Sequence, residues 1–369
     1  MDVDRLEPWF RLKAVPGIGD LLFRRLITAV GTPESVFSAS KDVLLGIQGM
    51  SPKLVEAIYR QKIPENFLSE VKRVSSVGGR ILTLTDADYP SLLMEIDDPP
   101  PMLYVLGRLK TQEPAVAVVG SRNATAYGID TTRRLCRQLA REGITVVSGM
   151  ARGIDTAAHE GAVDGGGRTI AVTGCGLDTV YPPENKGLFR RIASAGAVIS
   201  EFPMGAGPDP HHFPRRNRII SGLGMGVVVV EATLRSGSLI TAKTALDQGR
   251  EVFAVPGSIH SFKSTGTHAL IKQGACLVES VSDILEELPM LKETVSSNHR
   301  GDPQEMPTPS VTTEEARILE ALGPCEMQFD ELARKLAMPA GRLSGLLLNL
   351  ELKGAVHQSA GNHYSKTNR

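Results

Sequence analysis

The sequence predicts an α/β protein with a doubly wound parallel sheet at its centre, a small helical domain before the sheet and a winged helix after it. Short Val, Ile and Ala runs alternate with helical stretches from Val116 to about Glu287. Apolar residues recur at helical spacing before this region, and a helix, helix, turn, helix, hairpin order follows it. With 369 residues, the chain can form two or three domains, each with its own core.

The first segment, residues 1–75, predicts a domain of short amphipathic helices. Apolar residues repeat at helical spacing through LLFRRLITAV and KLVEAIY. Two glycine-containing hairpins interrupt the helices.

The second segment, residues 76–290, predicts the sheet domain. Its apolar runs are VAVVG, ITVVSG, TIAVTG, AVISE, GVVVVEA, EVFAVPGS and ACLVE. Strands that are apolar throughout are covered on both faces, which is typical of parallel sheets with helices on each side. We expect the lead-in, ILTLTDADYPSLLMEIDDPPPMLYVLG, to pack on one edge of this sheet.

The last two segments are a predicted linker and a predicted winged helix. Residues 291–312 are polar and contain prolines, which is typical of a linker. Residues 313–369 then contain three helical stretches, EEARILEAL, FDELARKLA and RLSGLLLNLELKG, followed by a hairpin around Gly361. That order predicts a winged-helix domain.

Composition limits the kind of site that the chain can carry. Because 41 Lys and Arg balance 41 Asp and Glu, no global positive field draws the chain to nucleic acid, and any DNA contact must be local. The cysteines lack the close spacings of a zinc site or a disulfide framework, so we expect reduced, buried thiols at Cys136, Cys175, Cys276 and Cys325. The N-terminus is acidic, and no run approaches the roughly 20 apolar residues that span a bilayer. We expect a cytoplasmic protein with no metal, cofactor or membrane partner.

Candidate phosphate-binding loops follow the predicted strands, because the site of a doubly wound sheet lies beyond the carboxyl ends of its strands. Glycine permits close backbone approach, hydroxyl groups donate hydrogen bonds, and a following helix offers unpaired amides at its positive end. The loops contain Gly120, Ser121 and Arg122; Ser148, Gly149 and Arg152; Gly174, Cys175 and Gly176; and Ser236, Gly237, Ser238 and Thr241. Glycines can also serve only as tight turns, but four such loops at one edge, three with an arginine alongside, favour phosphate binding.

The strongest local basic cluster is HHFPRRNR, residues 211–218, which enters a predicted helix. Its Arg and Phe side chains can clamp a backbone and stack on a base, and Asn can bind a base edge. The alternative is a solvated helix start. However, cations at a helix N-terminus oppose the helix dipole and call for an anionic partner, which favours a binding role.

Two other patterns imitate functional sites. Gly174-Cys175-Gly176 follows a strand and Glu201 ends the next, as in a dinucleotide fingerprint, but Tyr181-Pro182-Pro183 delays the helix that this fingerprint needs. Asp155 and His159 lie one helical turn apart and could share a metal or a proton. Without a third ligand or a nucleophile, we expect a carboxylate near a helix start and an ordinary helix histidine.

The chain resembles the DNA processing protein A family, also called Smf. The resemblance rests on GSRNATAYG, SGMARGIDTAAHEGA, TGCGLDTVYPPEN, SEFPMG, FPRRNRIISGL, VVVVEATLRSGSLITAKTAL and VPGSIHSFKSTGTHALIKQGA, in unbroken order over residues 80–280. Residues 15–19 and 47–51 are similar to helix-hairpin-helix loops, as in the family's small N-terminal, SAM-like domain. These loops could bind duplex backbone through exposed amides, or only brace helices and contact protein.

The resemblance implies an extended Rossmann-like fold and a non-catalytic protein that binds and protects incoming single-stranded DNA, forms homodimers, and loads RecA recombinase during natural transformation. By motif, Gly120, Ser121 and Arg122 would hold one phosphate, and the neighbouring nucleotide would contact Phe213, Arg215, Asn217 and Arg218. The floor would include Ser148, Gly149, Ser236, Gly237, Ser238 and Thr241. Many relatives have a lysine just before the FPxRNR segment, whereas this chain has Asp209-Pro210-His211-His212, which puts that phosphate contact in doubt or makes it pH-dependent.

An enzyme is the rival hypothesis. The sheet and its GSR loop are also similar to nucleoside-monophosphate phosphoribohydrolases of the lysine-decarboxylase-like group, which carry a PGGxGTxxE loop with a functional glutamate. The matching stretch here, residues 235–242, has no glutamate on its first turn, and Glu231 lies on the strand side of the loop. Cleavage of a glycosidic bond needs a carboxylate within hydrogen-bond reach, and the sequence offers none there.

Overall fold

The computed structural model describes residues 2–291, 312–322, 327–353, 355–359 and 362–366. It divides into two compact units, residues 1–299 and 300–369, which are described separately. No helix in the described ranges has the length and apolar character needed to cross a membrane.

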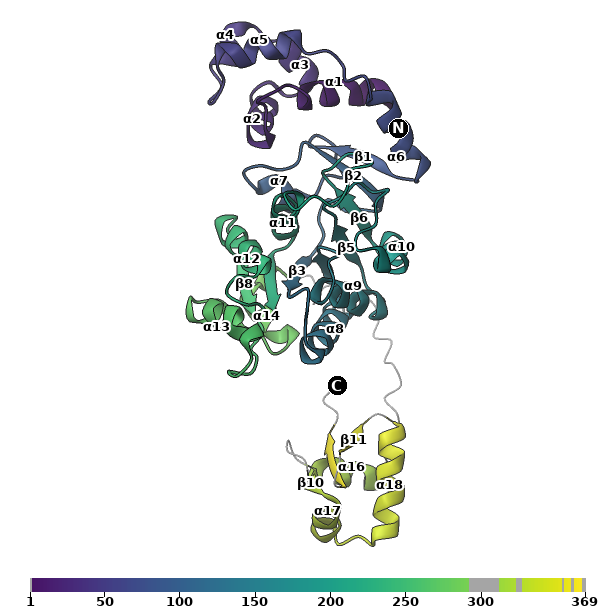
Figure 1. Cartoon of the computed structure of the whole chain (residues 1–369). Coiled ribbons are helices and arrows are strands. Elements are labelled where there is room, and N and C mark those ends of the chain that lie inside the picture. Colours follow the sequence, from purple (N-terminus) through teal and green to yellow (C-terminus); the bar gives the residue numbers. More distant parts are fainter. Residues whose placement is uncertain (1, 292–311, 323–326, 354, 360–361, 367–369) are drawn as a thin grey trace. The chain divides into compact units, whose positions relative to one another are not determined.

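Six helices form the N-terminal part of the first unit (Figure 1). They are α1 (Val3–Lys13), α2 (Asp20–Val30), α3 (Pro33–Ser38), α4 (Lys41–Leu45), α5 (Pro52–Arg60) and α6 (Phe67–Ser76). Side chains cap several of their N-termini; for example, Ser51 accepts a hydrogen bond from the Leu54 amide at 3.3 Å. Gly17 and Gly49 have φ of 90° and 94°, and they turn the two predicted hairpins. Trp9 on α1 stacks on Phe23 on α2, with ring centroids 5.6 Å apart.

A nine-stranded sheet forms the centre of the first unit, in the order β1-β2-β6-β5-β4-β3-β7-β8-β9. Seven strands are parallel: β3 (Ala115–Gly120), β4 (Thr145–Ser148), β5 (Thr169–Val172), β6 (Ala197–Ser200), β7 (Gly226–Val230), β8 (Glu251–Ala254) and β9 (Cys276–Leu277). The lead-in supplies β1 (Arg80–Thr83) and β2 (Met102–Gly107), which extend the sheet in antiparallel pairing beside β6, so the predicted edge position is confirmed.

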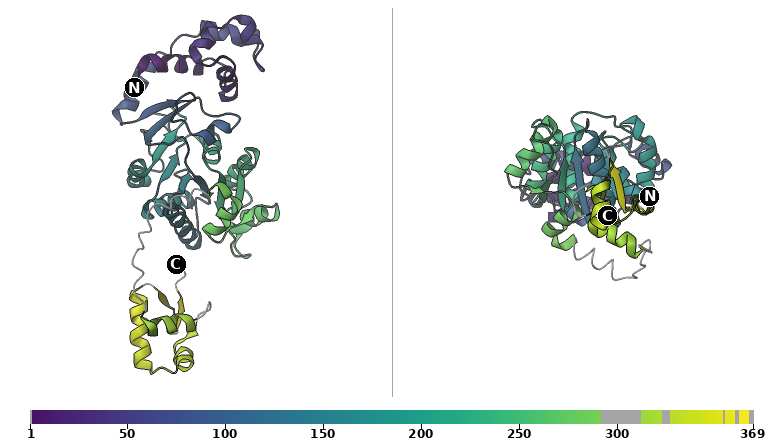
Figure 2. Two further views of the ribbon diagram at one scale, coloured as in Figure 1. Left: turned by 180° about the vertical axis from the view of Figure 1, so that it is seen from behind. Right: turned by 90° about the horizontal axis from the view of Figure 1, so that it is seen from below.

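Helices cover both faces of this sheet, as the apolar strands predict (Figures 1 and 2). Val116 and Val118 of β3 pack in a cluster with residues of α8 (Ala126–Arg141), α9 (Ile154–Asp164) and α14 (Val281–Glu287). Ala117 and Val119 point the other way and pack in a cluster with α11 (His212–Leu223) and α12 (Gly237–Asp247). The remaining helical segments of this unit are α7 (Ser91–Glu95), η1 (Pro183–Asn185), α10 (Lys186–Ala195), η2 (Phe262–Ser264) and α13 (Thr265–Lys272).

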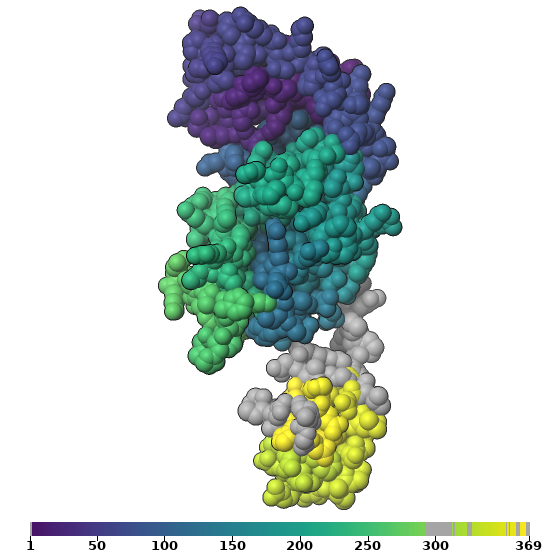
Figure 3. All heavy atoms as spheres, viewed as in Figure 1, coloured from purple at the N-terminus to yellow at the C-terminus, as the bar shows by residue number. Residues whose placement is uncertain are grey.

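The N-terminal helices lie against the sheet domain (Figure 3), and polar groups take part in this contact. The buried carboxylate of Glu70 on α6 accepts a hydrogen bond from the Met204 amide at 2.7 Å. Arg73 on the same helix pairs with Asp178 at 2.6 Å. These contacts join residues more than 100 positions apart in the chain.

The second unit is a winged helix. It contains α16 (Thr313–Ala321), β10 (Met327–Gln328), α17 (Phe329–Leu336), α18 (Ala340–Leu352), β11 (Val356–Ser359) and β12 (His363–Lys366), with its strands in the order β10-β12-β11. Ile318, Leu332 and Leu347 are in its core. The predicted linker falls, apart from residues 291 and 312, outside the described residues, as does Cys325. Cys136 and Cys175 are buried as predicted, whereas Cys276 is partly exposed.

Candidate nucleic-acid interface

A hollow of about 690 Å³ opens at the carboxyl ends of β3 and β7. It brings together residues from several separated segments, among them the loop after β3, the start of α12 and one face of α11. The predicted site residues that line it are Gly120, Ser121, Arg122, Phe213, Asn217, Ser236, Gly237, Ser238 and Thr241. Convergence of these loops follows from the parallel strand order, because the carboxyl ends of parallel strands share one edge.

A second hollow of about 380 Å³ adjoins the first and shares Arg122, Tyr181 and Phe213 with it. It also contains two predicted site residues, Gly149 and Arg152. Tyr181 is 42 % exposed, and its ring lies 6.0 Å from that of Phe213. Aromatic side chains in this arrangement offer a surface on which a base can stack.

Two glycines in these loops have no room for a side chain. A Cβ on Gly120 would lie 1.9 Å from the Val230 carbonyl oxygen. A Cβ on Gly149 would lie 2.6 Å from Arg216 Nη2 and 2.6 Å from Asp155 Oδ2. The glycines therefore allow β3 and β7 to pack closely and leave space for the buried groups under the hollow.

Arg122 is the exposed cation at the rim of both hollows. Its guanidinium carbon lies 5.0 Å from the centre of the Phe213 ring, within the range of a cation–π contact. Among the residues that the structure describes, it has no ion-pair partner. Arg122 is thus positioned by an aromatic ring and keeps its charge available to an anion.

The start of α12 supplies hydroxyl groups on the opposite wall. Ser236 is the N-cap of this helix, and its Oγ lies 2.7 Å from Ser238 Oγ. Ser238 in the first turn and Thr241 at the start of the second are buried. Because the first amides of a helix are unpaired and carry partial positive charge, this wall suits a phosphate oxygen.

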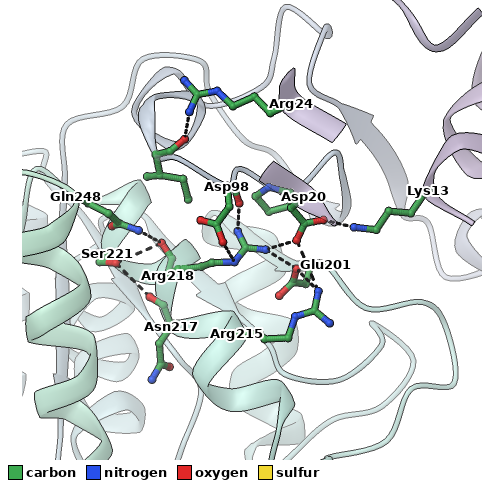
Figure 4. Close-up of polar contacts among 12 residues, drawn as sticks. Lys13, Asp20, Arg24, Asp98, Glu201, Arg215, Asn217, Arg218, Ser221 and Gln248 are labelled. Carbon is green, nitrogen blue, oxygen red and sulfur yellow. Dashed lines mark hydrogen bonds and ion pairs between the residues drawn. The ribbon is translucent and has the colours of Figure 1, made fainter. Parts of the chain in front are cut away.

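The same helix that carries Phe213 and Asn217 turns Arg215 and Arg218 away from the hollow. Successive residues of a helix are about 100° apart, so residues 213, 216, 217 and 220 share one face. All four line the hollow, whereas Arg215 and Arg218 do not. Figure 4 shows both arginines in a cluster with acidic side chains, and Asn217 pointing away from it. The structure therefore places Asn217 in the hollow without Arg215 and Arg218, and a DNA contact of these two arginines stays a prediction.

The guanidinium of Arg218 is held by three acidic residues. Its Nη2 lies 2.9 Å from Asp20 Oδ2 and 2.7 Å from Glu201 Oε2, and its Nε lies 3.4 Å from Asp98 Oδ2. The side chain of Arg218 is only 10 % exposed. Its contact with Asp20 links the first residue of α2 to the sheet domain (Figure 4).

Arg215 lies beside the same carboxylates but remains 55 % exposed. Its Nη2 is 3.4 Å from Glu201 Oε2 and 3.7 Å from Asp20 Oδ2. Both pairs are long, and the guanidinium stays in contact with solvent although the two carboxylates are buried. Arg215 is therefore the more available of the two arginines to an outside anion.

Comparison with known proteins agrees with this architecture. Residues 80–289 match the family described as DNA recombination-mediator protein A, residues 302–362 match the DprA winged helix domain, and residues 11–61 match the SAM-like helix-hairpin-helix tandem. The chain belongs to the DNA recombination-mediator protein A family. The predicted resemblance and fold class are confirmed.

Similar proteins and structures of this family support the assignment. Protein Smf of Synechocystis sp. is 36 % identical over 97 % of this chain and 98 % of its own length. DNA processing protein DprA of Streptococcus pneumoniae is 48 % identical over 56 % of this chain and 73 % of its own length. The X-ray structure of DNA processing protein A from S. pneumoniae has a TM-score of 0.65 and 38 % identity, over 76 % of this chain and 96 % of that chain.

A further solved structure, of DNA processing protein A from Helicobacter pylori, is described as showing a unique single-stranded DNA binding mode. It has a TM-score of 0.51 and 29 % identity, over 60 % of this chain and 96 % of that chain.

In this member of the DNA recombination-mediator protein A family, Arg216 lines the hollow, although the pocket predicted by motif left out this arginine of the basic cluster. It is 3 % exposed, and its Nη1 donates hydrogen bonds to the carbonyl oxygens of Gly149 and Val172, at the ends of β4 and β5. Burial lowers the pKa of Arg216 to about 10, so it stays charged at neutral pH. Its spacing of three residues from Phe213 could have identified it.

The other predicted residues have structural partners. Ser148 is buried and donates a hydrogen bond to the Val118 carbonyl at 2.6 Å. Arg152 lines the second hollow but pairs with Glu184. His212, near the position where many relatives have lysine, stacks on Phe202 with ring centroids 3.9 Å apart, and its Nδ1 lies 3.0 Å from the Gly174 carbonyl oxygen.

Asp155 and His159 have the ordinary environments that the sequence predicted. Asp155 Oδ2 accepts a hydrogen bond from the Ala151 amide at 3.3 Å, and burial raises the pKa of its carboxyl group. His159 Nδ1 lies 2.7 Å from Thr169 Oγ1, and burial lowers the histidine pKa to about 3. His159 is therefore neutral at physiological pH.

Proposed function

We propose that the chain is a non-catalytic protein that binds single-stranded DNA in the hollow at the carboxyl ends of β3 and β7. The exposed charge of Arg122 carries this proposal, because Arg122 and the start of α12 line the same hollow together with hydroxyl groups. In this arrangement a phosphate binds between Ser121, Arg122 and the first turn of α12. A neighbouring base stacks on Phe213 beside Tyr181.

The shape of the site favours a single strand over a duplex. A hollow of about 690 Å³ accommodates a nucleotide whose base is unpaired. The groups that line it suit phosphates and ring faces and do not read base edges, apart from the amides of Asn123 and Asn217. Binding should accordingly show little sequence selectivity. The binding mode named for the H. pylori relative is in line with this choice.

The wider role follows from the family. A recombination mediator acts together with a recombinase, so we propose that this protein protects incoming single strands and loads RecA recombinase onto them in the cytoplasm, during natural transformation. Homodimerisation through the sheet domain is proposed on the same ground. The family match over residues 80–289 supports these statements.

The arrangement of carboxylates supports binding over glycosidic cleavage. Glu231 accepts hydrogen bonds from the Thr125 amide and hydroxyl at the start of α8, so its carboxylate faces away from the main hollow. Among the described residues that line this hollow, Asp155 is the single carboxylate, and glycoside cleavage ordinarily uses a pair. Incubation with nucleoside monophosphates should release no free base; release of base at a rate that depends on Asp155 would favour the phosphoribohydrolase alternative.

Arg122→Ala tests the binding proposal directly. Loss of a charge-assisted phosphate contact should weaken binding of a labelled oligothymidine by about 1–3 kcal/mol, as measured by fluorescence anisotropy. Arg134→Ala is the matched control, because Arg134 is exposed in the middle of α8 and lines neither hollow. If folded Arg122→Ala protein binds like the parent, the hollow is not the DNA site.

A further inference from the structure

The acidic latch, defined here as the cluster of Asp20 and Glu201 around Arg215 and Arg218, joins the N-terminal helices to the sheet domain (Figure 4). Asp20 opens α2 directly after the first hairpin, whereas Arg215 and Arg218 lie on α11, nearly 200 residues later. The first hairpin thus presents a carboxylate to the helix that carries Phe213. The ion pairs of Asp20 with Arg215 and Arg218 therefore join the start of α2 to α11 within one chain.

A carboxylate between two guanidinium groups occupies the same kind of environment as a backbone phosphate. A single oxygen of Asp20, Oδ2, lies 2.9 Å from Arg218 Nη2 and 3.7 Å from Arg215 Nη2. Both anions accept charge-assisted hydrogen bonds from arginine. Asp20 therefore neutralises positive charge of Arg215 and Arg218 that would otherwise attract DNA phosphates.

The position of Arg215 places this competition beside the proposed binding site. Arg215 is two residues from Phe213 on α11, and its guanidinium lies 5.6 Å from the Phe202 ring. Because residues 213 and 215 lie on opposite sides of the helix, a strand that leaves the main hollow has to cross the first turn of α11 to reach Arg215. Because Arg215 is 55 % exposed, a phosphate can approach it without unfolding the helix.

In the docked cluster, loss of the Asp20 charge alone would leave one unbalanced positive charge. Lys13, Arg215 and Arg218 contribute three positive charges, and they meet three negative charges from Asp20, Asp98 and Glu201. Asp20 and Lys13 are the members from the N-terminal helices. If Asp20 moves away, Arg218 retains Glu201 at 2.7 Å and Asp98 at 3.4 Å, so α11 keeps its anchor.

We propose that Asp20 competes with the DNA backbone for Arg215. The Asp20 carboxylate, directly after the first hairpin, occupies the place of a phosphate at Arg215. Docking of the N-terminal helices and full binding of single-stranded DNA therefore oppose each other. The proposal rests on the proposed single-strand binding. Because coupling between two binding events is reciprocal, DNA should loosen the hairpin contact by the same factor by which removal of Asp20 tightens DNA binding.

The test compares Asp20→Asn with Asp42→Asn on the full chain. Asp42 is an exposed acid in the first turn of α4, so its substitution removes the same charge from a helix start of the same domain. Asp20→Asn should tighten binding of a labelled oligothymidine about two- to fivefold, the value expected for one exposed ion pair, and Asp42→Asn should not. The plot of log affinity against log salt should steepen by up to about 0.7 for Asp20→Asn, because one more phosphate is neutralised.

Two further experiments separate this proposal from its alternatives. In an Arg215→Ala background, Asp20→Asn should no longer tighten binding. In the parent protein, an excess of oligothymidine should speed hydrogen exchange of the first hairpin and the start of α2, a measurement that needs no variant to fold. Equal affinities of Asp20→Asn and Asp42→Asn, or unchanged exchange on DNA addition, would overturn the proposal. If the parent protein binds no single strand, the proposed function itself fails.

Discussion

Arg218→Ala should destabilise the first unit strongly, because Arg218 is the cation at the centre of the acidic latch. Its removal takes the nearest counter-charge from Glu201, whose side chain is 3 % exposed, and leaves Asp20, which is 9 % exposed, with Lys13 and Arg215 only. Breaking a buried ion pair from one side typically costs about 3–5 kcal/mol. Asp20→Asn should cost less, because Arg218 then still pairs with Glu201 and Asp98.

Urea unfolding, followed by tryptophan fluorescence, measures this loss. The chain has one tryptophan, Trp9, which is 3 % exposed and stacks on Phe23 in the N-terminal helices. With a slope of about 3 kcal/mol per molar urea, Arg218→Ala should lower the midpoint by about 1 M or more. Arg134→Ala, which removes an exposed arginine, should change the stability by less than about 0.5 kcal/mol. A midpoint for Arg218→Ala within about 0.2 M of the parent would show that the latch does not stabilise the fold.

The remaining predictions concern the floor of the site, the winged helix and the oligomeric state. Gly149→Ala should destabilise the protein by about 1–3 kcal/mol in the same urea assay, because its Cβ would lie 2.6 Å from Arg216 Nη2; Gly187→Ala, whose Cβ has no neighbour within 4 Å, should not destabilise it. Deletion of residues 311–369 should leave single-strand affinity within about threefold, under about 0.7 kcal/mol, and a tenfold loss in anisotropy measurements would show that the winged helix contacts DNA directly. Light scattering should give about twice the 39.6 kDa of the chain at micromolar concentration, and a value near 40 kDa would contradict the proposed dimer.

Charge is the reason that the winged helix is not expected to be the main DNA contact. Residues 311–369 contain equal numbers of basic and acidic side chains. Two of the basic ones, Arg342 and Lys353, pair with Glu314 and Glu315. A domain that binds DNA through a recognition helix ordinarily brings surplus positive charge to neutralise phosphates. The third helix, α18, is mostly apolar, which suits core packing or a protein partner better than a major groove.

Local patterns in the sequence were sufficient to predict the fold and to select residues most of which line the two hollows. Periodicity and uniformly apolar strands predicted a parallel sheet covered on both faces, and the loops after β3 and β7 meet where parallel strands end. These features depend on the period of helices and strands and on a known rule of sheet topology. Gly120, Arg122 and Ser236 accordingly lie together at the hollow.

The sequence alone did not show which face of α11 lines the hollow. The arginine cluster at residues 215–218 looked like one positive patch, yet helical geometry divides it between the hollow, the interior and the acidic latch. The partner that decides the matter, Asp20, lies 198 positions from Arg218, and a single sequence contains no signal for a pair so distant. The buried role of Arg216, by contrast, could have been predicted from its spacing to Phe213.

Comparison of single-stranded with duplex DNA tests the central claim most directly. Fluorescence anisotropy with an oligonucleotide and with its blunt duplex of equal length, at several salt concentrations, gives both the preference and the number of phosphate contacts. We expect the single strand to bind more tightly at every salt concentration, with an affinity that falls as salt rises. Tighter binding of the duplex would contradict the proposed site.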